Sequence, residues 1–278
     1  MSKTLLKSTL MLFTGSMIFA AISVPAFAAP VPVSPPASLV AAPALGAAST
    51  FGILGATTTV TDQTKVTGDL GSGGSTGTAT VTGATDVANQ AYTQAQTDLV
   101  AALTEANTET PTTTVTGSDT SLGGQTLTPG VYHYSGAVTI GSDLTLDGAG
   151  VYIFQINGAL TTAANTVITL KDGADACQVF WVPDVATLGA GSTFEGTLMS
   201  MSAITVGANS TTYGRILAET AVTANAADTQ VVVPDCDLAP SVGGLPEVPA
   251  AGIFPLIGLA GLIAYRLRIG SRSKPKNR

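Results

Sequence analysis

The stretch "ATLGAGSTFEGTLMSMSAITVGANSTTYGRILAETAVTANAADTQVVV" (186–233) repeats itself every eighteen residues. Threonine recurs at two phases of this period, at Thr187, Thr205 and Thr223 and again at Thr193, Thr211 and Thr229. In each unit, small residues mark the turns between short apolar segments. A period near 20 residues with several short strands per unit is typical of a solenoid, whose coils stack on one another.

The pattern extends toward the N-terminus through "GAVTIGSDLTLDGAGVYIFQI" (136–156) and "GALTTAANTVITLKDGADACQVFWV" (158–182). The equivalent threonines of the five units are Thr139, Thr161, Thr187, Thr205 and Thr223. Because side chains alternate along a strand, these threonines should face outward and their apolar neighbours inward. The expected inward residues are Val138, Leu160, Ala186, Ile204 and Val222. We therefore predict a mainly β protein, a β-solenoid with three strands per coil.

One segment, "TDVANQAYTQAQTDLVAALTEAN" (85–107), has the spacing of a helix instead. It lacks internal Gly and Pro, and Thr85 or Asp86 could cap its start. Its apolar stripe comprises Tyr92, Ala95, Leu99, Ala102, Leu103 and Ala106. We predict one long amphipathic helix over about 86–107. The third strand of each coil is apolar on both faces, so the helix should pack there, with Phe180 and Trp181 beneath it.

The two ends of the chain differ in composition from its middle. Lys3 and Lys7, an apolar run and "AFA" (26–28) are typical of a secretory signal peptide. The predicted organisation is a signal peptide (1–28), a Pro/Ala-rich linker (29–44), the solenoid domain (45–237), a Pro-rich stalk (238–251), an apolar segment (252–269) and a basic cytoplasmic tail (270–278). We expect an exported protein held at the cell surface.

The C-terminal segment leaves two anchoring routes open. The apolar run is short beside the roughly 17–25 residues of most membrane spans. A Pro-rich spacer, an apolar run and a basic end also resemble a bacterial surface-sorting signal, but "LPEVPAAG" (245–252) lacks the Thr-Gly of the common signal. The expected partner is thus the membrane or the cell wall, and processing would give a secreted form.

Between residues 29 and 265, three basic residues stand against eighteen acidic ones, a formal charge of −15. Nucleic acid is therefore excluded as an expected partner, since phosphate binding needs clustered Lys and Arg. Two cysteines, Cys177 and Cys236, in an exported chain favour a disulfide, with two buried thiols as the alternative.

Four coils carry alanine and threonine three residues apart, in "AANT" (163–166), "AGST" (190–193), "ANST" (208–211) and "AADT" (226–229). Stacked coils would align these residues as an uncharged column of methyl and hydroxyl groups. Short side chains lose little rotamer entropy on binding. Such a level surface suits a crystalline partner better than a small molecule, which needs a concave pocket.

Several longer motifs give the domain a family resemblance. They are "LGAASTFGILGATTTVT" (45–61), "VTGDLG" (66–71), "LGGQTLTPGVYHYSGAVTI" (122–140), "GVYIFQINGAL" (150–160) and "GSTFEGTLMSMSAITVGANSTTYGRILAETAVT" (191–223). In these motifs the chain resembles the bacterial and fungal ice-binding protein family over 45–235. The resemblance implies a right-handed β-solenoid of triangular cross-section with one long helix alongside. It also implies that N-terminal strands pack next to C-terminal coils.

The same resemblance implies an ice-binding surface. Ice-binding members often carry a T-A/G-x-T/N motif, whose first position is alanine in all four matching coils here. The expected primary face comprises Ala163, Thr166, Ala190, Thr193, Ala208, Thr211, Ala226 and Thr229. The runner-up face comprises Thr187, Thr205 and Thr223. The alternative function is a structural or adhesive cell-surface domain without strong ice activity.

An enzymatic reading finds little support in the sequence. His133 stands apart from any Ser or Cys in a recognisable motif, and catalytic sites need convergent groups. Asp147 and Glu195 occupy equivalent positions of different coils, but no basic residue accompanies them. We expect a monomeric, non-enzymatic protein without a cofactor or a metal, whose partner is the ice surface with its ordered water.

Overall fold

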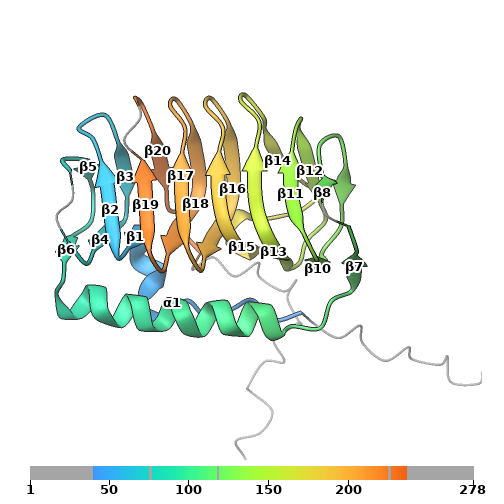
Figure 1. Cartoon of the computed structure of the whole chain (residues 1–278), viewed down its shortest axis with the longest axis horizontal. Coiled ribbons are helices and arrows are strands. Elements are labelled where there is room, and N and C mark those ends of the chain that lie inside the picture. Colours follow the sequence, from blue (N-terminus) through green and yellow to red (C-terminus); the bar gives the residue numbers. More distant parts are fainter. Residues whose placement is uncertain (1–39, 75–76, 118, 225–226, 237–278) are drawn as a thin grey trace, which may run out of the picture. The chain divides into compact units, whose positions relative to one another are not determined.

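The structure is a computed structural model that describes residues 40–74, 77–117, 119–224 and 227–236. The predicted signal peptide, stalk, apolar segment and basic tail lie outside the described residues, as does most of the linker. No helix in the described ranges is long and apolar enough to cross a membrane. These ranges form stacked coils of parallel strands with one helix lying along them (Figure 1).

Most coils contribute a strand to each of three faces. The helix face contains β1 (Phe51–Gly55), β4 (Asp69–Ser72), β6 (Thr85–Val87), β7 (Thr113–Val115), β10 (Gly130–Tyr134) and the first parts of β13 (Tyr152–Thr162) and β15 (Val179–Leu188). The ends of β16 (Thr193–Ser200) and β18 (Thr211–Ala218) complete it. The prediction of a β-solenoid is confirmed.

The other two faces share the remaining strands. The threonine face contains β2 (Thr57–Val60), β8 (Asp119–Ser121), β11 (Ala137–Ile140), β17 (Ala203–Val206), β19 (Ala221–Ala224) and the last parts of β13 and β15. The third face contains β3 (Lys65–Thr67), β5 (Thr80–Val81), β9 (Thr126–Leu127), β12 (Leu144–Asp147), β14 (Ile168–Lys171), β20 (Gln230–Val232) and the first parts of β16 and β18.

The order of the coils in space differs from their order in the chain. Strands β1, β2 and β3 pair in parallel with β18, β19 and β20, which are the last strands of the domain. The chain therefore begins beside its final coil, builds β4–β6 outward, and crosses to the opposite end through the helix (Figure 1). From there the coils return to meet the first strands, as the family resemblance implied.

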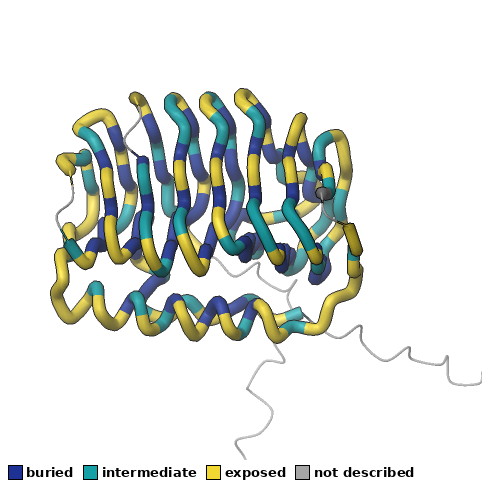
Figure 2. The backbone as a smooth tube through the Cα atoms, viewed as in Figure 1, coloured by how far each residue is buried: buried dark blue, intermediate teal, exposed yellow. Residues whose placement is uncertain are grey.

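The interior is filled by the apolar residues that the alternation predicted. Val138, Leu160, Ala186, Ile204 and Val222 are all buried. Burial alternates along the coils in the same way (Figure 2). The solenoid thus buries one residue in two on β2, β11, β17 and β19 of the threonine face.

Aromatic side chains also stack from coil to coil inside the solenoid. The ring centroids of Phe154 and Trp181 are 3.8 Å apart, and Tyr132 lies 5.3 Å beyond Phe154. The expectation that Trp181 lies under the helix is wrong, because its ring points into the solenoid and Nε1–H donates to the Glu195 carbonyl at 3.0 Å. Its neighbour Phe180 points the other way and packs against the helix, as predicted.

The helix α1 (Gln90–Thr108) begins four residues later than predicted. Residues 85–87 form strand β6 instead, since backbone pairing with β4 satisfies their hydrogen bonds. The cap is therefore Asn89, whose side-chain oxygen accepts from the Tyr92 N–H at 2.9 Å. The buried stripe is confirmed for Ala95, Leu99, Ala102, Leu103 and Ala106. It packs against Val131, Ile153, Phe180 and Leu217 of the helix face.

The chain enters the domain along this helix. The Ala47 N–H donates to Asp98 at 2.7 Å, and the Ala44 N–H donates to Glu105 at 2.9 Å. A carboxylate beside the free N–H groups of the short helix η1 (Gly46–Thr50) satisfies both charge and hydrogen bonding. The two acidic residues of α1 thus hold the entering segment in place.

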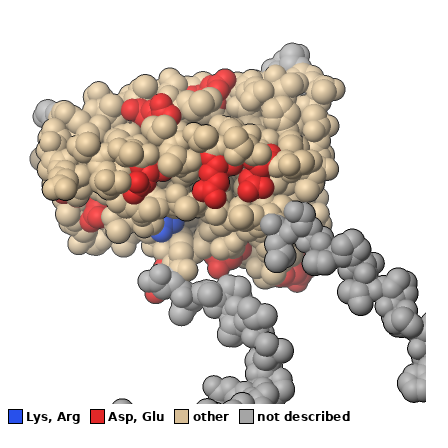
Figure 3. Space-filling view, turned by 90° about the horizontal axis from the view of Figure 1, so that it is seen from below, with Lys and Arg blue, Asp and Glu red and all other residues tan. Residues whose placement is uncertain are grey.

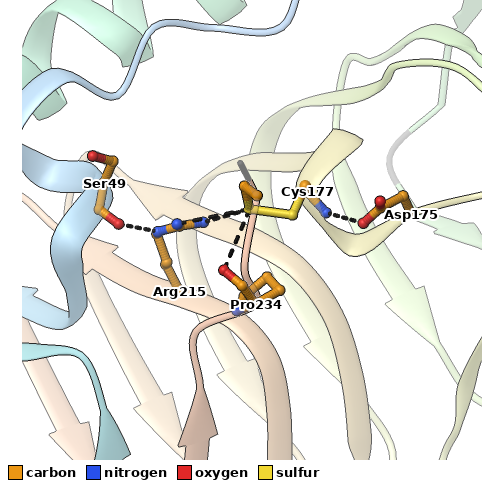
Figure 4. Close-up of a disulfide and its surroundings, with 6 residues drawn as sticks. Ser49, Asp175, Cys177, Arg215 and Pro234 are labelled. Atoms are coloured by element: carbon orange, nitrogen blue, oxygen red, sulfur yellow. Dashed lines mark hydrogen bonds between the residues drawn. A yellow bond between two sulfur atoms is a disulfide. The ribbon is translucent and has the colours of Figure 1, made fainter. Parts of the chain in front are cut away.

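A predicted disulfide joins Cys177, in η2 (Ala176–Gln178), to Cys236 beyond β20 (Figure 4). The buried Arg215 side chain lies next to it, with Nε donating to the Ser49 carbonyl at 2.7 Å and Nη1 facing the Cys236 sulfur at 3.7 Å. Burial lowers the pKa of the Arg215 guanidinium. The first segment, a middle coil and the closing strand therefore meet at one point.

Replacing both cysteines with serine should lower the melting temperature measured by circular dichroism. The bond closes a loop of 59 residues, for which chain entropy predicts about 4 kcal/mol of stabilisation. Reductant should lower the melting temperature of the parent by a similar amount and leave the double variant unchanged. An equal melting temperature for the parent and the double variant would show that β20 holds its place without the disulfide.

Candidate functional site

The turns after the threonine face reveal how the coils align. In each turn one residue has a positive φ: Asn165 (59°), Gly191 (70°), Asn209 (56°) and Asp228 (48°). Gly, Asn and Asp tolerate this conformation best, so these four residues occupy equivalent positions. The alignment therefore places "AANT" (163–166) and "AADT" (226–229) opposite 189–192 and 207–210, one residue away from the predicted match.

The predicted primary face is corrected by this shift. Thr166 and Thr229 lie at the position of Ser192 and Ser210, and all four side chains are buried. The hydroxyls of Thr166, Ser192 and Ser210 donate to the carbonyl three residues earlier at 2.6–3.0 Å. Thr229 donates to the Gly207 carbonyl at 3.4 Å. These residues stabilise the turns and present no hydroxyl to solvent.

Of the threonines predicted for the primary face, only Thr193 and Thr211 stand side by side on the surface. The next residue in their column is Val167 on one side and Gln230 on the other. Ala190 and Ala208 lie at equivalent turn positions, whereas Ala163 aligns with Gly189 and Gly207. Ala226 lies outside the described residues. The primary face is therefore two threonines wide.

The third face, which carries this pair, is also uneven. Glu195 and Tyr213 are neighbours on it, and the Tyr213 side chain is 43% exposed. Asp147 pairs with Lys171 on an adjoining coil. Burial raises the pKa of the Glu195 carboxyl to about 7, and the negative charge of Asp175 adds to the rise. Charged and bulky groups thus interrupt this face.

The threonine face is regular where the third face is not. Parallel pairing aligns one outward hydroxyl residue from every strand, in the order Ser121, Thr139, Thr161, Thr187, Thr205, Thr223 and Thr59. This hydroxyl ladder contains the whole runner-up face. With a strand spacing of about 4.7–4.9 Å, its seven positions span roughly 29 Å.

A second column runs beside the hydroxyl ladder, two residues earlier in each strand. Its members are Asp119, Ala137, Ala159, Val185, Ala203, Ala221 and Thr57. The two columns are about 6.6–6.8 Å apart because two strand residues span that distance. Between Ala137 and Thr223, alanine methyls and threonine side chains therefore stand in two adjacent columns, with Val185 as the exception among the alanines.

The electrostatics of the threonine face are simple. Its outward positions from Ala137 to Thr223 hold no Asp, Glu, Lys or Arg. Among the described residues, no protein group forms a hydrogen bond with the threonine hydroxyls of the ladder, which leaves them free to bind water. The side seen in Figure 3, which carries α1, instead bears several acidic groups and a small basic area. The uncharged part of the threonine face therefore runs from Ala137 to Thr223, and Asp119 lies in the register position beside Ala137 at its end.

The repeat pattern in the sequence did not identify two members of the hydroxyl ladder, Thr59 and Ser121. Thr59 lies 80 residues before Thr139, the first ladder residue that the repeat predicted, and it joins the ladder only because β2 pairs with β19. A usable signal was "TTTV" (57–60), which matches "AVTA" (221–224) in its buried second and fourth positions. Ser121 follows residue 118, which is not described, and belongs to a short strand at the solenoid end.

Comparison with known proteins places this surface in context. A family profile described as ice-binding-like matches residues 44–230. The chain is 39% identical over 171 residues to an ice-binding protein of Nostoc sp. (strain HG1), covering 58% of this chain and 62% of that protein. An ice-binding protein of Flavobacterium frigoris (strain PS1) is 34% identical over 182 residues, covering 58% and 66%.

A solved structure shows the same architecture. The crystal structure of an ice-binding protein from the Antarctic ascomycete Antarctomyces psychrotrophicus superimposes with a TM-score of 0.65 at 34% identity. The match covers 70% of this chain and all of the fungal chain. The protein belongs to the ice-binding-like family, since the family profile covers more than half of the chain. The chain spans just under two thirds of the Nostoc and Flavobacterium relatives.

Replacing Glu195 with Gln should make the stability of the folded protein less sensitive to rising pH. The folded carboxyl has a pKa of about 7 against an ordinary 4.5, so the parent binds a proton more tightly when folded. Its stability must then fall as the pH rises from about 4.5 to 7. In thermal unfolding at pH 5 and pH 8, the melting temperature of the variant relative to that of the parent should be higher at pH 8 than at pH 5. If the difference in melting temperature between variant and parent is the same at both pH values, the pKa of the Glu195 carboxyl is not raised.

Proposed function

We propose that this protein adsorbs to ice through the threonine face. The observation that carries the proposal is the ladder of seven aligned hydroxyl residues, which runs beside a column made mostly of alanine. The outward positions of this face from Ala137 to Thr223 carry no charge. A crystal surface is rigid and repetitive, so it is best matched by groups whose spacing the backbone itself fixes. The family relationship supports the same partner.

The proposed mechanism needs no chemical step. Threonine hydroxyls hydrogen-bond water, while the neighbouring methyl groups restrict where further water molecules settle. The short, β-branched side chains have few rotamers to lose when this water becomes ordered. The ordered layer then merges with the ice lattice and pins the growth front around each adsorbed molecule. Antifreeze activity, inhibition of recrystallisation and adhesion to ice would follow from this adsorption.

The features of the threonine face favour ice over a polymer or protein partner. Aromatic residues and Arg dominate the contacts at most protein interfaces. The outward positions of this face from Ala137 to Thr223 hold neither. The face is also flat, whereas small-molecule sites are concave. An adhesive role without ice binding remains the competing function, and activity measurements separate the two.

We propose that the protein is non-enzymatic and acts at the cell surface. The candidate groups for catalysis are dispersed: Asp147 pairs with Lys171, and His133 lies on the helix face opposite Gln155. Export is supported by the signal-like N-terminus and by a disulfide, which persists in oxidising compartments. The C-terminal apolar segment would anchor the protein or release it after processing.

Replacing Thr205 with Tyr should abolish ice binding, because one large ring in the middle of the ladder lifts a rigid partner off the neighbouring coils. The measurements are thermal hysteresis and inhibition of ice recrystallisation by residues 29–245. The matched control is Thr211→Tyr on the third face, where Tyr213 already projects. The control should keep the activity of the parent.

The opposite pattern would reject the threonine face. Loss of activity in Thr211→Tyr together with full activity in Thr205→Tyr would assign ice binding to the third face. A parent protein without thermal hysteresis or recrystallisation inhibition would reject the ice-binding function itself, and binding to cells or glycans would then support the adhesive role. Circular dichroism should confirm that both variants keep the parent fold.

A further inference from the structure

One residue breaks the second column of the threonine face. Val185 stands between Ala159, with which it pairs directly, and Ala203 of the next coil. Its side chain is 37% exposed, the only large apolar group at that level of exposure on the described part of this face. The valine thereby divides the column into two pairs of alanines. One pair is Ala137 and Ala159, and the other is Ala203 and Ala221.

The height of this side chain follows from its covalent structure. Valine carries two methyl groups one carbon–carbon bond, about 1.5 Å long, beyond the Cβ atom at which alanine ends. These methyl groups stand level with the γ atoms of the neighbouring threonine ladder, so Val185 fills the recess that the alanines of its column leave beside that ladder. Branching at Cβ restricts the rotamers of valine on a strand, so the methyl groups cannot fold away. Ala186 beside it points into the core and is buried, which fixes Val185 outward.

A rigid partner cannot adapt to such a step. Ordered water that lies in the recess above Ala159 and Ala203 cannot take the equivalent position above Val185, because the two methyl groups occupy it. Each water position that is lost removes the hydrogen bonds which that water would make to the ladder and to the ordered layer. The loss falls in the middle of the ladder, where the most neighbours are affected.

We propose that Val185 limits the fit of the threonine face to ice, so that a smaller residue at this position strengthens adsorption. This inference rests on the proposed function and adds the residue that sets its strength. The valine is favourable for the strand itself, since β-branched residues fit a pleated surface. The strand and the ice contact therefore favour different residues at this position.

The test is Val185→Ala, measured by ice-affinity partitioning and thermal hysteresis at equal protein concentration. Recovering about 0.4 kcal/mol of contact corresponds to roughly a two-fold rise in binding. The matched control is Val167→Ala, since Val167 is 36% exposed on the third face and loses the same two methyl groups. The control should equal the parent, and melting temperatures should show that both variants fold.

A second variant, Val185→Thr, separates height from polarity. Threonine has almost the shape of valine, so this variant should keep the parent activity. An equal rise in Val185→Thr and Val185→Ala would overturn the inference, because polarity and not height would then limit binding. An unchanged or lower activity in Val185→Ala would overturn it as well.

The failure of this inference can be told from the failure of the proposed function. If the parent binds ice and Thr205→Tyr does not, the threonine face is the ice-binding surface, and Val185→Ala then tests the inference alone. If Thr205→Tyr is as active as the parent, the threonine face is rejected and the inference with it.

Discussion

Hydrogen bonds between parallel strands of neighbouring coils hold side chains of the same phase one strand spacing apart, and most properties of this protein follow from that register. The register stacks the aromatic rings of Phe154 and Trp181 inside the solenoid and the threonines outside it. It also makes like charges in one column unfavourable, since they would sit less than about 5 Å apart. The low charge of the sequence is therefore a consequence of the stacking.

Much of the fold could be predicted because it is encoded locally. The eighteen-residue period identified the coils, and the alternation around Thr187, Thr205 and Thr223 gave the correct inward residues. The turns were harder, because alanine and threonine three residues apart can be aligned in two ways. The residues that decide between them are Asn165 and Asp228, whose tolerance of a positive φ marks the true position of the turn.

The candidate surface depends on pairing between distant parts of the chain, which no local pattern reveals. Thr59 extends the ladder because the first strands insert beside the last coil. In the same way, residues 85–87 carried a helical signal and became a strand because β4 offered them a partner. Sequence periodicity therefore identified the middle of the ladder, whereas its ends became clear only from the strand pairing in the structure.

The helix also limits how this architecture can change in evolution. Helix α1 has 19 residues and a length of about 28 Å, close to the span of the ladder that it runs beside. Because the chain must cross from one end of the stack to the other through this helix, an inserted coil would require about three more helical residues. Duplication of a coil alone would leave the crossover too short. The length of this one helix therefore sets how many coils the stack can hold, and with it the area of the flat face.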